Sequence, residues 1–579
     1  RPAAAAVTAL VYGIVPVPRN AIAAGRLGPL VLFALLPFLA LLVVRAGGFS
    51  GTAGSARRPL LGLAIATALA TAWYPPAALA VVVVASTLLV ASLLVGGGVA
   101  ALRAVGASLV GLLGAALLLA PWTVTVLDSR DDLAALGIAY HPHLDLSEVL
   151  RFQSGPAGAG IAPWGLLVAA AAALVLARGP RLAWAVRSWA LAVAGFAIVW
   201  LPSRLAPGTA VAAPEAGLAI AALGVAVAAG ITIGTSAEEL ADAKRFAWRR
   251  VVVGVAVAGV VLGGFGFLAD SISGRWGAPD GDWAGELSFT QDRAAEGQFR
   301  ILWVGDPDVL PLDPVESGSG PAWVLTRNGP GDARTLWRAP VTDADRVIGR
   351  ALEVAVGGNT ARLGRLLAPA GIRYVAVPLR NGPGGALGAP ARGVTGALAD
   401  QLDLARLRSE RGLILYENQS WAPASAVVTG REGDALPTGA VDPLRSAANT
   451  DRVGARPVGG DAPVPAGAVL LADAFADGWR AEGPEGVLRH QLSFGYLNSW
   501  RNPRAGAVSI THDGQGLRYA LLAGEVVLWL LALVWWSRGR QADRVQRAAT
   551  TRRQRVDREP RRTDLGNFAF DDDDFWSDS

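Results

Sequence analysis

The chain has 579 residues, of which 52% are hydrophobic, and it carries a formal net charge of +5. That apolar share exceeds the ~45–50% that soluble chains reach even with glycine counted, so the composition favours a membrane protein. Cysteine is absent, which excludes disulfides, thiolate metal sites and a cysteine nucleophile. The pI near 9.9 reflects basic residues at turns between apolar runs, so no nucleic-acid partner is expected.

The start of the chain is unusual because methionine is absent throughout, position 1 included. We therefore expect the sequence to be the C-terminal portion of a longer protein or a processed form. Lys244 is the only lysine, and Ala, Gly, Val and Pro are abundant. This composition is typical of a GC-rich genome such as that of an actinobacterium.

Apolar runs of membrane-spanning length begin in the N-terminal half. Each is near the length that crosses a hydrocarbon core of ~30 Å as a helix, and arginines mark the turns between them. Tyr74-Pro75-Pro76 interrupts a run too long for one crossing, because proline disfavours helix at and before its position. Run length and arginine placement together predict about ten crossings. They are 2–17, 28–44, 60–73, 77–101, 108–127, 164–177, 188–201, 218–234, 251–268 and 519–536.

A long insert separates the last two runs. The run 251–268 follows the basic cluster Lys244, Arg245, Arg249 and Arg250, and the run 519–536 exits into an arginine-rich tail. Positive charge marks cytoplasmic ends, so the insert is expected on the far side of the membrane.

The insert reads as α/β followed by β-rich. Strands are predicted at 299–304, 371–377, 413–416, 425–429 and 468–471, a helix at 360–368, and antiparallel strands within 487–517. The predicted fold class is a polytopic α-helical membrane protein with a large extracytoplasmic α/β plus β-rich domain inserted before the last helix. Its parts are a membrane domain (1–269), an extracytoplasmic domain (270–517), a final helix (518–537) and a disordered cytoplasmic tail (538–579), basic and then acidic.

The polar loop after the fifth predicted crossing holds the candidate catalytic residues. Sugar transfer from a polyprenyl phosphate needs a carboxylate to take the acceptor proton, and Asp128, Asp131 and Asp132 are the candidates. It also needs cations for the leaving phosphate, and Arg130 and Arg151 are placed for this. The alternative is a solvated connecting loop whose aspartates cap helices.

Three further candidates bind substrate in this hypothesis. His141 and His143 lie in the same loop, where with Asp145 they offer the alternative of a divalent metal as cofactor, although no metal site is assigned. Arg26 lies at the mouth of a crossing, where it either binds a lipid phosphate or snorkels to the interface.

Short motifs in the insert resemble a known superfamily. Gly371-Ile372-Arg373-Tyr374-Val375 and Tyr416-Glu417-Asn418 are similar to steps in the outer domains of the glycosyltransferase C superfamily and its YfhO-like relatives. Asp477-Gly478-Trp479-Arg480 and Asn498-Ser499-Trp500-Arg501 resemble the ending of the same domain before a last membrane helix. The resemblance implies an actinobacterial membrane glycosyltransferase, and some of the proteins it resembles look like fusions of an N-terminal family 2 glycosyltransferase domain to a membrane portion.

Two classes of function follow. The first is an enzyme of the plasma membrane that moves sugar from a polyprenyl-phosphate donor to a cell-envelope glycan, with membrane lipid around it. The second is a non-catalytic scaffold or glycan-binding component. A transporter ranks third, since the predicted crossings, Glu525 apart, lack the charges that mark ion pathways.

Overall fold

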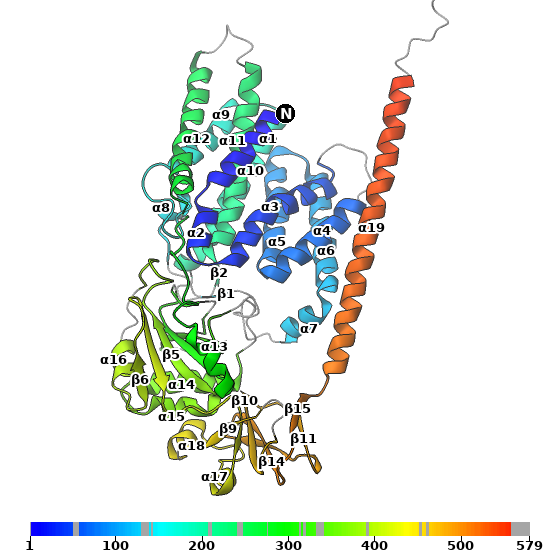
Figure 1. Ribbon diagram of the computed structural model, residues 1–579. Coiled ribbons are helices and arrows are strands. Elements are labelled where there is room, and N and C mark those ends of the chain that lie inside the picture. The colour runs from blue at the N-terminus through cyan, green and yellow to red at the C-terminus, as the bar shows by residue number, and fades with distance from the viewer. Residues whose placement is uncertain are drawn as a thin grey trace, which may run out of the picture.

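The computed structural model describes most of the chain. The described residues are 2–49, 57–128, 138–139, 143–205, 211–239, 247–274, 276–307, 309–311, 314–315, 320–331, 341–388, 393–450, 454–458 and 463–556. Figure 1 shows a helical bundle at one end, a β-rich domain at the other, and one long helix running alongside the bundle.

Helices make up the membrane part of the described chain. Eight stretches are long and apolar enough to cross a membrane, counting α1 and α2 together. The elements are α1 (Pro2–Ile14), α2 (Val17–Ala23), α3 (Leu27–Ala46), α4 (Arg57–Trp73), α5 (Ala77–Val95), α6 (Gly98–Leu118), α7 (Ala120–Asp128), α8 (Leu146–Leu150), α9 (Trp164–Leu176), α10 (Pro180–Leu205), α11 (Pro214–Glu239), α12 (Ala247–Ser273) and the last helix α19 (Gln515–Val556). The pair β1 (Ile138–Ala139) and β2 (Val211–Ala212) joins two of their loops.

Each of the ten predicted runs corresponds to helix, but two of these helices are short. Helix α4 has 17 residues and α9 has 13, so neither is among the eight long stretches. The break at Pro75-Pro76 is confirmed, because α4 ends at Trp73 and α5 begins at Ala77. The predicted run 77–101 is cut earlier, at Gly96 and Gly97, whose φ angles of 84° and 94° end a helix.

Small residues let the membrane helices approach closely. A Cβ placed on Gly165 of α9 would lie 2.3 Å from the Gly259 carbonyl oxygen of α12, and the reverse contact would be 2.4 Å. Helix α11 is the central element, with 83% of its apolar window buried. Since lipid gives helices little hydrophobic reason to associate, such backbone contact supplies the packing.

We call residues 270–517 the outer domain, after the side of the membrane predicted for them. This domain begins with a five-stranded sheet in the order β4-β3-β5-β7-β6. Strands β3 and β5 are parallel, and the other neighbouring strands are antiparallel. Buried side chains of α14 and β5, among them Ile348, Leu352 and Val375, share one core. The elements are β3 (Arg300–Gly305), β4 (Ala322–Arg327), β5 (Ile372–Pro378), β6 (Leu404–Leu407), β7 (Leu413–Asn418), α13 (Phe289–Arg293), α14 (Asp343–Val356), α15 (Leu363–Leu367) and α16 (Val394–Ala399).

A β-rich unit follows, as the alternating runs predict. One sheet has the order β13-β14-β10-β8-β9 and the other β12-β11-β15, all antiparallel. Its elements are β8 (Ser425–Val428), α17 (Gly430–Asp434), α18 (Pro443–Asn449), β9 (Ala455–Pro457), β10 (Gly467–Ala474), β11 (Trp479–Gly483), β12 (Gly486–Val487), β13 (His490–Ser493), β14 (Leu497–Asn502) and β15 (Ser509–His512).

The predicted strands of the insert are confirmed as β3, β5, β7, β8 and β10. Helix α15 starts at Leu363, three residues later than predicted, and β4, β6 and α14 were not predicted. The tail prediction is wrong at its start, because α19 continues to Val556. The acidic end of the tail lies outside the described residues.

Candidate functional site

A polar layer lies where the helical bundle meets the outer domain. Its centre is α2, a short helix that follows Pro16 and ends at Ala23, before α3 begins at Leu27. Arg19 and Asn20 are buried in it, at 5% and 0% exposure. We call the cluster of Arg19, Asn20, residues 153–157, Asp270 and Asn381 the α2 junction.

An ion pair fixes one side of the α2 junction. Arg19 Nη1 lies 2.5 Å from Asp270 Oδ2, near the end of α12. The Arg19 side chain is 6% exposed, whereas that of Asp270 is 34% exposed. One face of the carboxylate therefore stays open while the guanidinium holds the other.

Asn20 organises the loop that follows α8. Its Nδ2 donates to the carbonyl oxygens of Phe152 and Ala157 at 3.1 and 3.0 Å, and its Oδ1 accepts from the Ala157 N–H at 2.8 Å. Phe152 itself has a φ of 58°, a backbone conformation that is uncommon outside glycine. One buried amide thus holds the loop against α2 from both ends.

Unpaired polar atoms gather at the same place. Among the described residues, Arg19 Nε, Gln153 Oε1, Ser154 Oγ and Asn381 Oδ1 are buried without a hydrogen-bond partner. Asn381 also ties the outer domain to the bundle, because its Nδ2 donates to the Ala23 carbonyl at 2.9 Å. Buried polar atoms are costly when unpaired, so this concentration indicates a place for water or a polar ligand.

Arg26 has a carboxylate partner in addition to the two roles predicted for it, which stay predictions. Its Nη1 lies 3.1 and 3.2 Å from the two carboxylate oxygens of Glu215, which is fully buried at the start of α11. Arg26 therefore neutralises a buried carboxylate. The prediction that the crossings lack buried charges is wrong. Helices α10 and α11 begin before the predicted runs and include the buried residues Arg187 and Glu215.

The predicted catalytic loop is described only in part. Asp128 ends α7, and nothing is described of its side chain; Arg130, Asp131, Asp132 and His141 lie outside the described residues. The roles assigned to these residues therefore stay predictions.

The described end of that loop is local structure. His143 is exposed, and Arg151 donates to the carbonyls of Ser147 and Gly160 at 3.0 and 3.3 Å. Asp145 forms a capping box with Glu148 at the start of α8, which confirms the capping alternative at this position. Among the described residues, no group of three or more His, Asp or Glu side chains is placed to hold a metal.

The motifs in the outer domain hold its first sheet together. Arg373 of β5 is 3% exposed at its side chain, and its Nη2 lies 2.7 Å from Glu296 and 3.2 Å from Glu417. Its guanidinium carbon also lies 4.3 Å from the ring centre of Trp421. Hydrogen bonds from Arg373 and Arg293 hold the pKa of Glu296 below its ordinary value.

Asn418 serves the same sheet from the neighbouring strand. It is fully buried and donates to the carbonyls of Gly364 and Ile372 at 2.8 and 2.9 Å. Arg373 and Asn418 are thus buried and bonded to protein groups, and together with Glu417 they stabilise the sheet.

What the site can do follows from the α2 junction. Asp270 offers an accessible carboxylate, Arg19 a fixed cation, and Gln153, Ser154 and Asn381 unpaired polar atoms. Sequence reasoning missed this group because its members are far apart in the chain. The one available signal was Asp270 directly after the apolar run 251–268, opposite an Arg-Asn pair inside an apolar stretch.

Comparisons with known proteins give only a loose likeness. No protein-family model and no curated protein matches the chain. A cryo-EM structure of the arabinofuranosyltransferase AftD from Mycobacteria is 16% identical, over 79% of this chain and 34% of that chain, with a TM-score of 0.38. A second cryo-EM structure, class 2 of a mutant of the same enzyme, is also 16% identical. The match covers 76% of this chain and 35% of that chain, with a TM-score of 0.38. The chain spans about a third of the length of these structures, and the likeness transfers no residue or activity to it.

Proposed function

We propose that this chain is a membrane glycosyltransferase, or the membrane half of one, which moves a sugar from a polyprenyl-phosphate donor to a cell-envelope glycan. The observation that supports it most is the partly exposed carboxylate of Asp270, near the end of α12, beside the buried guanidinium of Arg19. A lipid-linked donor places its phosphate at this depth, where apolar helices give way to polar groups.

The reaction assigns a role to each charge. The acceptor oxygen attacks the anomeric carbon, its proton passes to a carboxylate, and the bond from the anomeric carbon to the phosphate oxygen breaks. The phosphate leaves with the bonding electrons, and a nearby guanidinium stabilises its added charge. Asp270 is one candidate for the base, with Arg19 as the phosphate partner; Asp128, Asp131 and Asp132 remain candidates, with Arg130 as their cation.

The proposed topology places the acceptor glycan and the α2 junction on the same side of the membrane. The insert 270–517 lies outside the cytoplasm, where the acceptor glycan is, and the tail lies inside. The α2 junction then faces the extracytoplasmic side, since it contacts the insert through Asn381.

The test is transfer of labelled sugar from a polyprenyl-phosphate donor in membranes that contain this chain. We compare Asp270→Asn, Asp128→Asn, Asp131→Asn and Asp132→Asn with Asp292→Asn, an exposed aspartate on α13 that serves as control. Loss of transfer in Asp270→Asn alone assigns the base to the α2 junction, and loss in one of the three loop variants assigns it to the loop after α7. Transfer that persists in all variants refutes both assignments.

The same assay separates the two classes of function. If only a longer gene product transfers sugar, the chemistry lies outside this chain, which is then the membrane and glycan-binding half. If neither transfers sugar, the scaffold alternative replaces the enzyme.

A further inference from the structure

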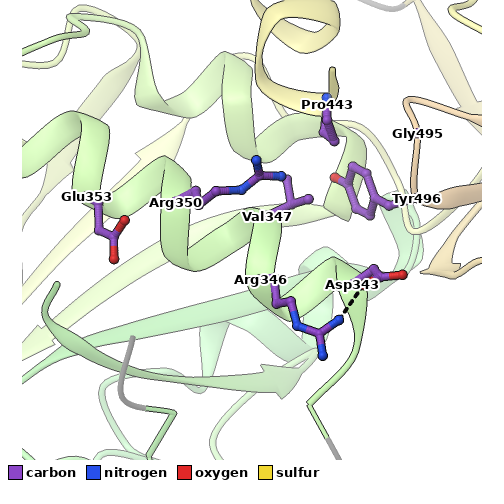
Figure 2. A pocket seen from close by; sticks show the side chains of 8 residues that line it. All are labelled: Asp343, Arg346, Val347, Arg350, Glu353, Pro443, Gly495 and Tyr496. Atoms are coloured by element: carbon purple, nitrogen blue, oxygen red, sulfur yellow. Dashed lines mark hydrogen bonds and ion pairs between the residues drawn. The ribbon is translucent and has the colours of Figure 1, made fainter. Parts of the chain in front are cut away.

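A cavity of about 430 Å³ lies in the outer domain, away from the α2 junction. Its walls come from three separate segments: helix α14, Pro443 at the start of α18, and the turn before β14 that holds Gly495 and Tyr496 (Figure 2). The volume is within the range of ~300–1,000 Å³ that is usual for small-molecule sites.

Tyr496 supplies a buried polar group inside this cavity. Its side chain is only 2% exposed, and Figure 2 shows its hydroxyl directed toward Val347 and the tip of Arg350. Among the described residues, no protein group hydrogen-bonds that hydroxyl. Burial raises the pKa of Tyr496 well above the ordinary value of 10.0, so the hydroxyl stays protonated and able to donate.

The turn that presents Tyr496 is fixed by the glycine before it. Gly495 has a φ of 75°, and a Cβ there would lie 2.4 Å from the Val441 carbonyl oxygen. Any other residue would shift the turn, and Tyr496 with it. The hydroxyl is therefore held in place before any ligand arrives.

The charged rim combines donors with acceptors. Arg346 Nη1 lies 2.5 Å from Asp343 Oδ1 on the same helix, one turn earlier. Arg350 lies one turn later on the same face and reaches across the cavity toward Pro443, with no side-chain partner among the described residues (Figure 2). Glu353 completes the rim, so its two carboxylates balance its two guanidinium groups.

We infer that this cavity binds a saccharide unit of a glycan outside the membrane. Sugar hydroxyls both donate and accept, so they pair with the Arg350 guanidinium and with the Tyr496 hydroxyl. Pro443, which is partly exposed, offers apolar surface to the C–H face of the ring. The balanced rim charge favours a neutral sugar over a bare anion.

The alternative is that these residues are only the solvated face of α14, and this explains fewer of the observations. Alternating charges on a solvated helix pair with one another, as Asp343 and Arg346 do. Such a face does not account for the hydroxyl of a nearly buried tyrosine, without a hydrogen-bond partner among the described residues, that another part of the chain directs into a half-open pocket. The inference goes beyond the proposed function, because it assigns recognition to the outer domain and holds whether or not the chain transfers sugar.

The experiment measures binding of fluorescently labelled, short neutral oligosaccharides to the full chain in detergent. We compare the wild type with Arg350→Gln and Tyr496→Phe. The control is Arg431→Gln, an exposed arginine of α17 outside the cavity. Loss of a hydrogen bond from a charged donor should weaken the dissociation constant at least about tenfold in Arg350→Gln, and loss of the hydroxyl about fivefold in Tyr496→Phe.

The control should bind as the wild type does, and all variants should keep the wild-type unfolding temperature. The inference is overturned if no neutral oligosaccharide binds, or if both cavity variants bind like the wild type. It is equally overturned if inorganic phosphate binds the full chain, Arg350→Gln weakens that binding, and no neutral oligosaccharide competes with it. Binding without any sugar transfer would contradict the proposed enzyme and leave this site standing.

Discussion

Arg373 of β5 and Glu417 of β7 face each other across two neighbouring strands, with the guanidinium Nη2 3.2 Å from the carboxylate. Tyr374 and Glu417 are directly paired in the strand register, so the resemblance motifs on these two strands meet in space. Arg373 also bonds Glu296, which precedes β3, and so joins three segments of the outer domain.

Removing Arg373 is therefore expected to destabilise the outer domain. In Arg373→Ala the sheet loses a buried guanidinium that bonds two carboxylates and lies over the Trp421 ring, so the loss of stability should be clearly larger than that of an exposed ion pair. The matched control is Arg501→Ala, whose pair with Asp434 is 70% and 64% exposed and should contribute less than ~1 kcal/mol. Thermal unfolding of the full chain in detergent measures both; equal losses in the two variants would contradict the structural role.

The Arg373 cluster also predicts a pH dependence. Hydrogen bonds from Arg373 and Arg293 lower the pKa of Glu296 below its ordinary value of 4.5, so the stabilisation is present above that value. It is lost as the pH falls through the lowered pKa. The unfolding temperature of the wild type should exceed that of Glu296→Gln at neutral pH, and the difference should shrink below ~pH 4. A difference that stays constant into the acid range would refute the linkage.

Asn20 is expected to be needed for the shape of the α2 junction. In Asn20→Ala, two carbonyls and one N–H lose their buried partner, which costs ~3 kcal/mol in total. The loop it holds should also loosen. Because the chain has no cysteine, Ser154→Cys introduces a single thiol there. Its maleimide labelling should speed up when Asn20→Ala is added; an unchanged rate would mean that the loop is held by other contacts.

The contact between α9 and α12 predicts a sharp difference between two glycines of one bundle. In Gly165→Ala the new methyl meets the Gly259 carbonyl, so the helices must separate at a cost of ~1–3 kcal/mol. Gly254→Ala, also on α12, meets nothing within 4 Å and should be neutral or slightly stabilising, since alanine favours helix. Thermal unfolding in detergent distinguishes them, and equal effects would mean that the close approach is absent.

The topology is expected to follow the positive charges. Single cysteines at Val487, which is 70% exposed in the outer domain, and at Ser577 in the tail provide two reporters. A membrane-impermeant maleimide should label Val487→Cys in intact cells and Ser577→Cys only after lysis. The reverse pattern would invert the proposed orientation.

Elements of the fold could be predicted wherever the signal is local. Each of the ten apolar runs falls on helix and five β-rich runs fall on strands, because length and composition decide them. Helix ends were less accurate: α11 starts at Pro214 and so includes Glu215, whereas the predicted run starts at residue 218. The ion pair with Arg26 allows the carboxylate of Glu215 to be buried at this helix start.

The candidate site could not be predicted in the same way. Arg19 and Asp270 are 251 residues apart, and the sequence around either residue does not predict a contact with the other. The polar loop after α7 was predicted as a site because its charged residues are adjacent in sequence. The charged residues of the α2 junction come together only when the bundle forms. Local density of polar residues and spatial convergence of polar residues are different properties.

The shortness of α9 has a consequence for the lipid around it. Thirteen residues of helix span ~20 Å, against ~30 Å of hydrocarbon. If α9 crosses the membrane as the sequence predicts, the bilayer thins beside it, or water enters above it, to match this length. The thinned zone lies next to the loop that Asn20 holds, since that loop leads directly into α9. A polyprenyl phosphate would then have a shorter way to travel from its bilayer position to the carboxylate of Asp270.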